Sequence, residues 1–144
     1  MITRSHIVSA ARGWLGTPYA HQASLRNVGT DCLGLIRGVW RDVCGDEPEC
    51  VPPYSPDWAE AGGAEALAMA ARRHLHEVPI GEFAAGDVLL FRWRPHLAAK
   101  HAGIAVSATH MVHAQDNARV TEIALSGWWL RHLAFAFRFP GVMD

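Results

Sequence analysis

Apolar residues in the first half of the chain recur every three or four positions, the spacing of a helix that buries one face. This pattern predicts a first helix over residues 3–14, ended by Gly16-Thr17-Pro18, because glycine and proline both interrupt helices. A second helix is predicted over residues 31–43, and Cys32 lies on its apolar stripe. An Ala- and Leu-rich stretch predicts a third helix over residues 58–75.

From residue 88 onward the pattern changes to the alternation typical of strands. The predicted strands cover residues 88–91, 102–106, 110–114, 119–123 and 133–139. The segment 45–57 contains four prolines and predicts an irregular connection, while Trp128-Trp129 fits helix or loop equally well. Helices followed by strands predict an α+β fold, with N-terminal helices packed on an antiparallel β-sheet.

Length and composition limit the classes of protein that fit. The 144 residues, half of them apolar, suit one domain over residues 1–144 with a real core. A formal net charge of −1 argues against nucleic-acid binding, and no apolar run approaches the about 20 residues of a membrane span. The N-terminus lacks the pattern of a signal peptide. Three cysteines, an odd number, fit a reduced compartment better than a disulfide framework.

Cys32 is the strongest candidate for chemistry, because it lies in the first turn of a predicted helix. The positive end of a helix dipole lowers the pKa of a thiol, and the thiolate is the nucleophilic form. Its place on the apolar stripe predicts a thiol that points toward whatever the helix packs on. Asp31, immediately before it, fits a helix N-cap at least as well as a catalytic group.

Strand alternation tests whether two histidines can meet. A three-residue turn at 107–109 would pair Gly103 with His113, leaving His101 diagonally opposite on the same face, with about 7 Å between the Cα atoms. A two-residue turn would place the two histidines on opposite faces. Gly103 is small, so we expect it to leave room for the helix end that carries Cys32.

These residue types match the set that cysteine hydrolases need. Cys32 would be the nucleophile, held partly as thiolate, and His101 the general base and then acid. His113 would orient the His101 ring. The oxyanion needs donors, for which the Cys32 backbone N–H and the Tyr19 hydroxyl are candidates.

The nine histidines do not predict a metal site, and no cofactor is expected. His110 and His113 face opposite ways on a strand, and Cys44 and Cys50 lack the usual zinc spacing. Cys44 continues the helix stripe and suits packing, while Cys50 has no assigned role. We expect three further histidines on the surface, with His96 also able to line a cleft: His21, His96 and His132.

Five segments in order resemble the NlpC/P60 family of cell-wall cysteine peptidases, whose fold is papain-like. The matching segments are Leu15-Gly16-Thr17-Pro18-Tyr19, Asp31-Cys32-Leu33-Gly34-Leu35, Gly86-Asp87-Val88-Leu89-Leu90-Phe91, His101-Ala102-Gly103-Ile104-Ala105 and Met111-Val112-His113-Ala114. The resemblance implies hydrolysis of peptidoglycan stem peptides, commonly at the γ-D-glutamyl to diamino-acid bond. It also implies the catalytic roles named above for Cys32, His101 and His113, with Tyr19 beside the nucleophile.

The resemblance further implies substrate contacts around the nucleophile and in the insert over residues 92–100: Asp31, Leu33, Gly34 and His96. The family usually has serine where this chain has Leu33. The insert and Trp128-Trp129 look like the branch found in prophages and gene transfer agents. That branch implies phage-like tail proteins as partners and action in the periplasm without a signal peptide.

Three alternatives stay open at this stage. The protein could be a tail-tip structural or binding module with little turnover, which Leu33 favours and the intact Cys32 and histidines oppose. It could also be a cysteine-dependent amidase or acyltransferase on another substrate. Trp128 and Trp129 fit glycan stacking, core packing or a partner contact equally well.

Overall fold

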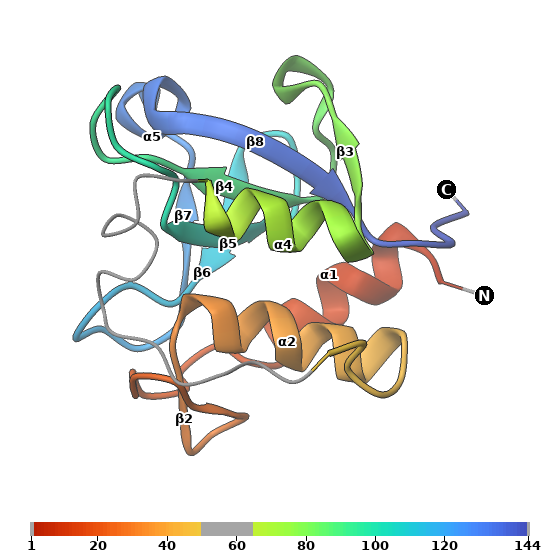
Figure 1. Ribbon diagram of the computed structural model, residues 1–144. Helices are drawn as coiled ribbons and strands as arrows, with labels where there is room; N and C mark the ends of the chain where they lie inside the picture. The colour runs from red at the N-terminus through yellow and green to blue at the C-terminus, as the bar shows by residue number, and fades with distance from the viewer. Residues whose placement is uncertain (1, 50–64, 144) are drawn as a thin grey trace.

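The computed structural model describes residues 2–49 and 65–143. Its helices are α1 (Arg4–Arg12), α2 (Cys32–Val43), α4 (Ala66–His74) and α5 (Gly127–His132), with a 3₁₀ turn η1 (Ile80–Glu82). Its strands are β1 (Ser24–Leu25), β2 (Gly29–Thr30), β3 (His76–Val78), β4 (Val88–Phe91), β5 (His101–Ala105), β6 (His110–His113), β7 (Thr121–Ala124) and β8 (Leu133–Arg138). The last six form an antiparallel sheet in the order β3-β8-β4-β5-β6-β7 (Figure 1). The predicted α+β fold is confirmed.

The predicted elements match closely where the pattern was regular. Helix α1 starts after Thr3, whose hydroxyl accepts a hydrogen bond from the His6 N–H, and α2 starts after Asp31. The five predicted strands all occur, with ends shifted by a residue or two. Of the predicted helix 58–75, the part 58–64 lies outside the described residues, as does Cys50.

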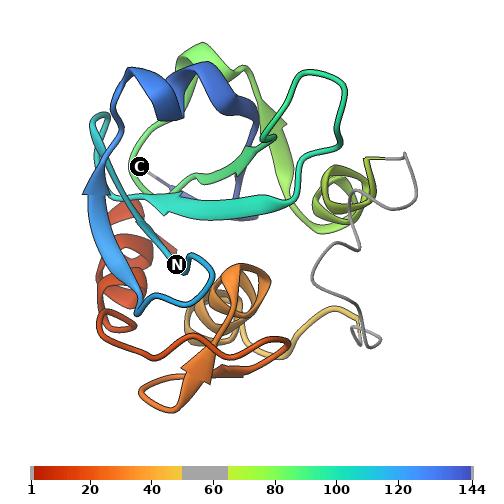
Figure 2. The same cartoon turned by 90° about the vertical axis from the view of Figure 1, so that its left-hand side faces the viewer.

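Two apolar clusters pack on opposite faces of the sheet. Helices α1 and α2 cover one face, where the cluster includes Ile7, Leu35, Val39, Ala102, Ile104 and Val112. The other cluster includes Leu89, Phe91, Ala105, Met111 and Leu133, with Trp129 of α5 packed against it. Figure 2 shows α2 and α5 on opposite sides of the sheet. The central strands β4 and β5 are therefore buried on both faces, whereas the edge strands β3 and β7 are largely exposed.

The predicted register of β5 and β6 is confirmed, but the predicted face is wrong. Gly103 pairs with His113, so His101 and His113 share a face. That face belongs to the cluster of Ala105 and Met111, and α2 packs on the opposite one. A Cβ at Gly103 would lie 2.7 Å from the Met111 sulfur, so the glycine makes room for that side chain and not for a helix. Strand periodicity could not tell which face the helix covers, because both faces are buried.

Short elements escaped prediction. The β1–β2 hairpin and β3 are strands of two or three residues, too short to show alternation. Residues 127–132 form α5, which settles the choice between helix and loop at Trp128-Trp129. Among the described residues, no helix is long and apolar enough to cross a membrane.

Candidate active site

The start of α2 is held by Asp31, which acts as its N-cap. One carboxylate oxygen accepts a hydrogen bond from the Gly34 N–H at 2.7 Å and the other from the Gln22 N–H at 2.8 Å. Gly34 packs so closely on the preceding loop that an added Cβ would lie 1.9 Å from the Ala23 carbonyl oxygen. Gly34 therefore allows α2 to pack closely against the preceding loop, and it does not line the pocket beside Cys32 that is described below.

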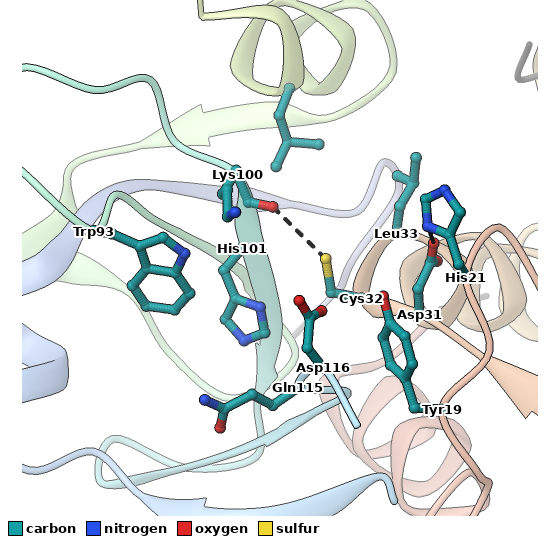
Figure 3. Close-up of a pocket in the computed structure, with 11 residues that line it drawn as sticks. Tyr19, His21, Asp31, Cys32, Leu33, Trp93, Lys100, His101, Gln115 and Asp116 are labelled. Atoms are coloured by element: carbon teal, nitrogen blue, oxygen red, sulfur yellow. Dashed lines mark hydrogen bonds and ion pairs between the residues drawn. The ribbon is translucent and has the colours of Figure 1, made fainter. Parts of the chain in front are cut away.

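The thiol of Cys32 reaches the sheet at the beginning of β5. Its Sγ donates to the Lys100 carbonyl oxygen at 3.7 Å, and the Ala102 N–H hydrogen-bonds to the sulfur. These two backbone groups flank His101 in sequence, as Figure 3 shows for Lys100. A helix on one face of the sheet thus approaches a histidine on the other face by meeting the end of the strand.

His101 and His113 form the hydrogen bond that the register predicts. His101 Nε2 lies 2.8 Å from His113 Nδ1, and the two residues are 5% and 2% exposed. Because Nε2 is engaged by His113, Nδ1 is the ring nitrogen of His101 that remains for proton exchange with a thiol.

Aromatic rings enclose this pair of histidines. The Trp93 ring stacks on His101 with 5.3 Å between centroids and 25° between planes. Trp129 lies 5.8 Å from His101 and 5.2 Å from His113. Sequence reasoning missed Trp93 altogether, and of the three alternatives for Trp129 the structure shows packing. Trp128 remains 44% exposed.

Tyr19 lies beside the nucleophile because its segment pairs with the residues just before α2. Tyr19 forms a bridge to Thr30, and the Thr30 N–H donates to the Pro18 carbonyl oxygen at 3.0 Å. Burial raises the pKa of Tyr19, as do the charge of Asp116 and a hydrogen bond to that carboxylate. The hydroxyl therefore already has an acceptor in Asp116.

These residues surround one pocket of about 240 Å³ (Figure 3). Its lining comprises Tyr19, His21, Asp31, Cys32, Leu33, Leu67, Trp93, Lys100, His101, Gln115 and Asp116. His96 is exposed and does not contribute to the lining, unlike the prediction that it could line a cleft. His21, expected on the surface, is exposed but sits at the pocket with its Nδ1 3.9 Å from Asp31.

Six lining residues were not predicted as site residues: His21, Leu67, Trp93, Lys100, Gln115 and Asp116. A signal was present, because Lys100 immediately precedes His101 and Gln115-Asp116 follow His113 by two and three residues. Residues next to candidate catalytic side chains at strand ends line the same cleft. That criterion does not reach Trp93, which depends on the path of the insert.

Protonation in the resting state differs from the expectation of a thiolate. Burial, followed by the charge of Asp31, raises the pKa of Cys32 to about 12. The Leu33 N–H at the helix start acts in the predicted direction, but its contribution is smaller. Burial lowers the pKa of His101 to about 3, with further lowering from His113 and Lys100, and lowers that of His113 to about 4. At neutral pH the site therefore holds a neutral thiol and two neutral imidazoles.

Other candidate groups do not gather into a second centre. Within residues 2–49 and 65–143, no three side chains of histidine, cysteine, aspartate or glutamate are placed to hold a metal ion. Cys44 is half-buried against the α1–α2 cluster, as its position on the helix stripe predicts.

Several solved structures similar to this one are described as NlpC/P60 proteins or domains. A Staphylococcus aureus protein of the NLP/P60 family, described as similar to a lipoprotein, has a TM-score of 0.62 and 22% identity over 98% of this chain and 42% of its own. The NlpC/p60 domain of the peptidoglycan hydrolase SagA has a TM-score of 0.65 and 22% identity over 96% of this chain and 100% of its own. A Bacillus cereus NlpC/P60 protein has a TM-score of 0.68 and 18% identity over 95% of this chain and 40% of its own.

The chain thus spans about two fifths of the S. aureus and B. cereus proteins. No curated protein matches it in sequence. A sequence model of the NlpC/P60 family matches residues 16–138, which include the nucleophile candidate, both histidines and the whole pocket lining. The chain belongs to the NlpC/P60 family.

Proposed function

We propose that the protein is a cysteine peptidase that hydrolyses peptidoglycan stem peptides through Cys32, His101 and His113. The observation that carries the proposal is the arrangement of the two histidines. A 2.8 Å bond holds His101 by Nε2, while its ring shares a pocket with the Cys32 thiol at a helix start. Nucleophile, base and orienting group are the three parts that acyl transfer by cysteine requires.

The proton movements follow from the tautomers. For Nδ1 of His101 to accept a proton, Nε2 must carry the hydrogen and donate it to His113 Nδ1. The Sγ–H proton of Cys32 passes to Nδ1 as the sulfur attacks the substrate carbonyl carbon. The tetrahedral intermediate then collapses, His101 returns the proton to the leaving amine, and a thioester remains on Cys32. His101 then takes a proton from water, whose oxygen attacks the thioester carbon; the C–S bond breaks, the acyl group leaves as the carboxylic acid, and His101 returns the proton to the Cys32 sulfur.

Charge on the substrate oxygen needs donors in the same pocket. The Cys32 N–H is a first-turn donor of α2, which lacks an acceptor within its own helix. The Tyr19 hydroxyl is the second candidate and must leave Asp116 to serve. Proton transfer from a neutral thiol fits this resting state better than a permanent thiolate.

We propose the γ-D-glutamyl to diamino-acid bond as the scissile bond, because the resemblance to the family implies it. Leu33 stands in the pocket where the family usually has serine, so the contact there is apolar. Asp31 lines the pocket as well, but one carboxylate oxygen caps α2 at the Gly34 N–H and the other accepts from the Gln22 N–H of the preceding loop. Substrate recognition at Leu33 should therefore depend on shape more than on hydrogen bonding.

The proposal includes delivery by a phage-like tail and action in the periplasm. Its support is the insert over residues 92–100 and Trp128-Trp129, which resemble the prophage and gene-transfer-agent branch. Affinity capture of tail proteins from induced cells by the tagged protein tests this part separately from the activity.

A docking module without turnover is the second candidate. The neutral thiol and imidazoles favour it, because the raised pKa of Cys32 leaves little thiolate at neutral pH. The same fold could also serve an amidase or acyltransferase with another substrate. These candidates differ in whether and where a muropeptide is cut.

The test is digestion of purified muropeptides with product analysis by mass spectrometry. We expect the native protein to cleave, Cys32→Ala to lose at least about a thousandfold in rate, and Cys44→Ala to retain it. Cys44 is the matched control because it is also a half-buried free cysteine, and it caps the C-terminal end of the helix that begins at Cys32. Turnover that survives in Cys32→Ala would refute the nucleophile, and no cleavage by the native protein would favour the docking module.

A further inference from the structure

Two tryptophan rings lie beside His101 and contact each other, with 6.0 Å between their own centroids. The Trp93 centroid is 5.3 Å from that of His101 with the planes 25° apart, and the Trp129 centroid is 5.8 Å from it with the planes 38° apart. Both distances fall within the about 6 Å over which an aromatic face attracts a cation. Figure 3 shows Trp93 beside His101, on the side of the ring away from Cys32.

Trp93 is fixed there by the ends of the insert. Glu65, just before α4, accepts a hydrogen bond from Arg92 at 2.8 Å and from the Ala99 N–H at 2.9 Å. Arg92 also donates to the Leu97 carbonyl oxygen at 2.7 Å. These hydrogen bonds hold both ends of the insert, and the insert carries the Trp93 indole that stacks on His101.

The proposed reaction needs a positive charge at His101 in a buried place. Its hydrogen-bond partner is an imidazole, not a carboxylate. The titratable side chains around the ring are His113, Lys100, Cys32, Tyr19, His21, Asp31 and Asp116. His113 and Lys100 both oppose a charge on His101. Apart from His113, the described side chains whose rings contact His101 are aromatic, and an aromatic face can favour an imidazolium.

We propose that the ring faces of Trp93 and Trp129 stabilise the imidazolium that His101 becomes when it takes the Cys32 proton. The two tryptophans are positioning residues, acting through His101 and not on the substrate. They thereby favour the thiolate–imidazolium pair over the neutral pair. The inference rests on the proposed roles of Cys32 and His101.

The test measures alkylation of Cys32 by iodoacetamide across pH 5–9, followed by mass spectrometry of the Cys32 peptide. The thiolate displaces iodide, so the rate reports the thiolate–imidazolium population without a peptide substrate. Trp93→Leu keeps an apolar side chain but removes the π face. We expect the rate at neutral pH to fall about tenfold and the profile to move to higher pH, while Trp93→Phe stays within about threefold of native.

Two controls separate the explanations. Trp128→Leu changes a tryptophan that contacts Trp93 and Trp129, and its ring has no contact with either histidine in the described structure, so its profile should match the native one. Near-ultraviolet circular dichroism checks that each variant is folded. An unfolded Trp93→Leu would transfer the test to Trp129→Leu and Trp129→Phe, which probe the second ring with the same expected ratio.

Equal profiles for the leucine and phenylalanine variants would overturn the inference, because exclusion of water alone would then explain the tryptophans. His101→Ala distinguishes this failure from failure of the proposed function. If His101→Ala reacts at the native rate, His101 is not the base and the proposed function fails. If His101→Ala is slow and Trp93→Leu is native-like, only the role of the tryptophans fails.

Discussion

Two buried polar clusters lie at opposite ends of the β4–β5 pair, and they are built differently. Next to the start of β4, Asp87 is fully buried and accepts hydrogen bonds from Arg138 at 2.9 and 3.0 Å and from Arg4 at 3.3 Å. At the other end, Phe91 pairs with His101, which is bonded to His113. One cluster is charged and has counter-charges, whereas the other is neutral and has none.

The difference in charge pairing suits the Asp87 cluster to a structural role and the histidine cluster to proton transfer. The Asp87 cluster ties α1 and β8 to the turn before β4, and each of its charges has a partner. The histidine cluster is kept neutral by burial, and it can gain a proton only at an energetic cost. An imidazole without a fixed counter-charge can take up a proton and return it during a reaction, whereas a carboxylate locked in an ion pair cannot.

Removing the counter-charged carboxylate should produce the largest change in stability. We expect Asp87→Asn to lower the free energy of unfolding by about 3 kcal/mol, because two arginines then lose their buried partner. Arg4 and Arg138 are 23% and 29% exposed, so water can relieve part of the loss. Urea unfolding measures it, and alkylation of Cys32 in the folded fraction should stay unchanged.

Glu122→Gln is the matched control for that experiment. It removes one negative charge from a single, more exposed ion pair, Arg12–Glu122, in which the side chains are 49% and 28% exposed. The urea midpoint should hardly move. An equal loss in both variants would mean that overall charge, and not the buried cluster, determines the stability.

Acid should weaken the histidine end selectively. Both histidines have pKa values in the folded protein, about 3 and about 4, below the ordinary value of 6.5. Between the folded values and 6.5 the unfolded chain therefore binds more protons than the folded protein. The contribution of the neutral histidines to the free energy of unfolding is fully present above about pH 6.5 and is lost as the pH falls toward 3. We expect a loss on the order of a few kcal/mol between pH 7 and pH 4.

His113→Gln and His110→Gln test this on a single strand. His113 is buried and His110 is exposed, at opposite ends of β6. The slope of unfolding free energy against pH should become shallower in His113→Gln and stay native in His110→Gln. Both variants retain all the carboxylates, so a difference between them reports on the histidines. Native slopes in both variants would show that the histidine pair does not control the acid sensitivity.

Sequence reasoning predicted those parts of the fold that hydrophobic periodicity determines. The stripe of α2, the five longer strands and the β5–β6 register all follow from alternation and turn length. It misjudged the face of the sheet on which α2 packs, because Ala102 and Ile104 are as buried as Gly103 and Ala105. A strand buried on both faces carries no polar side to orient it.

The site divides in the same way. Cys32, His101 and His113 could be picked from residue type and position, since their geometry depends on one helix start and one hairpin. The stacking of Trp93 depends on how Glu65 and Arg92 hold the insert, which is a tertiary contact without a local pattern. The neutral thiol was missed because burial and Asp31 together outweigh the helix N-terminus.

Asp31 gives the smallest and most specific test, because it is a buried carboxylate immediately before Cys32, and His21, 3.9 Å away, is a cation only when protonated. Its charge raises the pKa of Cys32. Asp31→Asn removes that charge while its side-chain oxygen can still cap the Gly34 N–H. We expect the thiol pKa to fall and iodoacetamide alkylation at neutral pH to rise by up to about tenfold.

Asp42→Asn is the control, because it removes a charge from the other end of the same helix, where Asp42 accepts a hydrogen bond from Trp14. Its alkylation profile should match the native one. A slower reaction in Asp31→Asn would reverse the interpretation: the carboxylate would then favour the His101 imidazolium more than it opposes the thiolate. Asp31 would in that case be a distant counter-charge for the histidine pair. Both clusters would then contain a carboxylate, and they would differ in how far it lies from the cation.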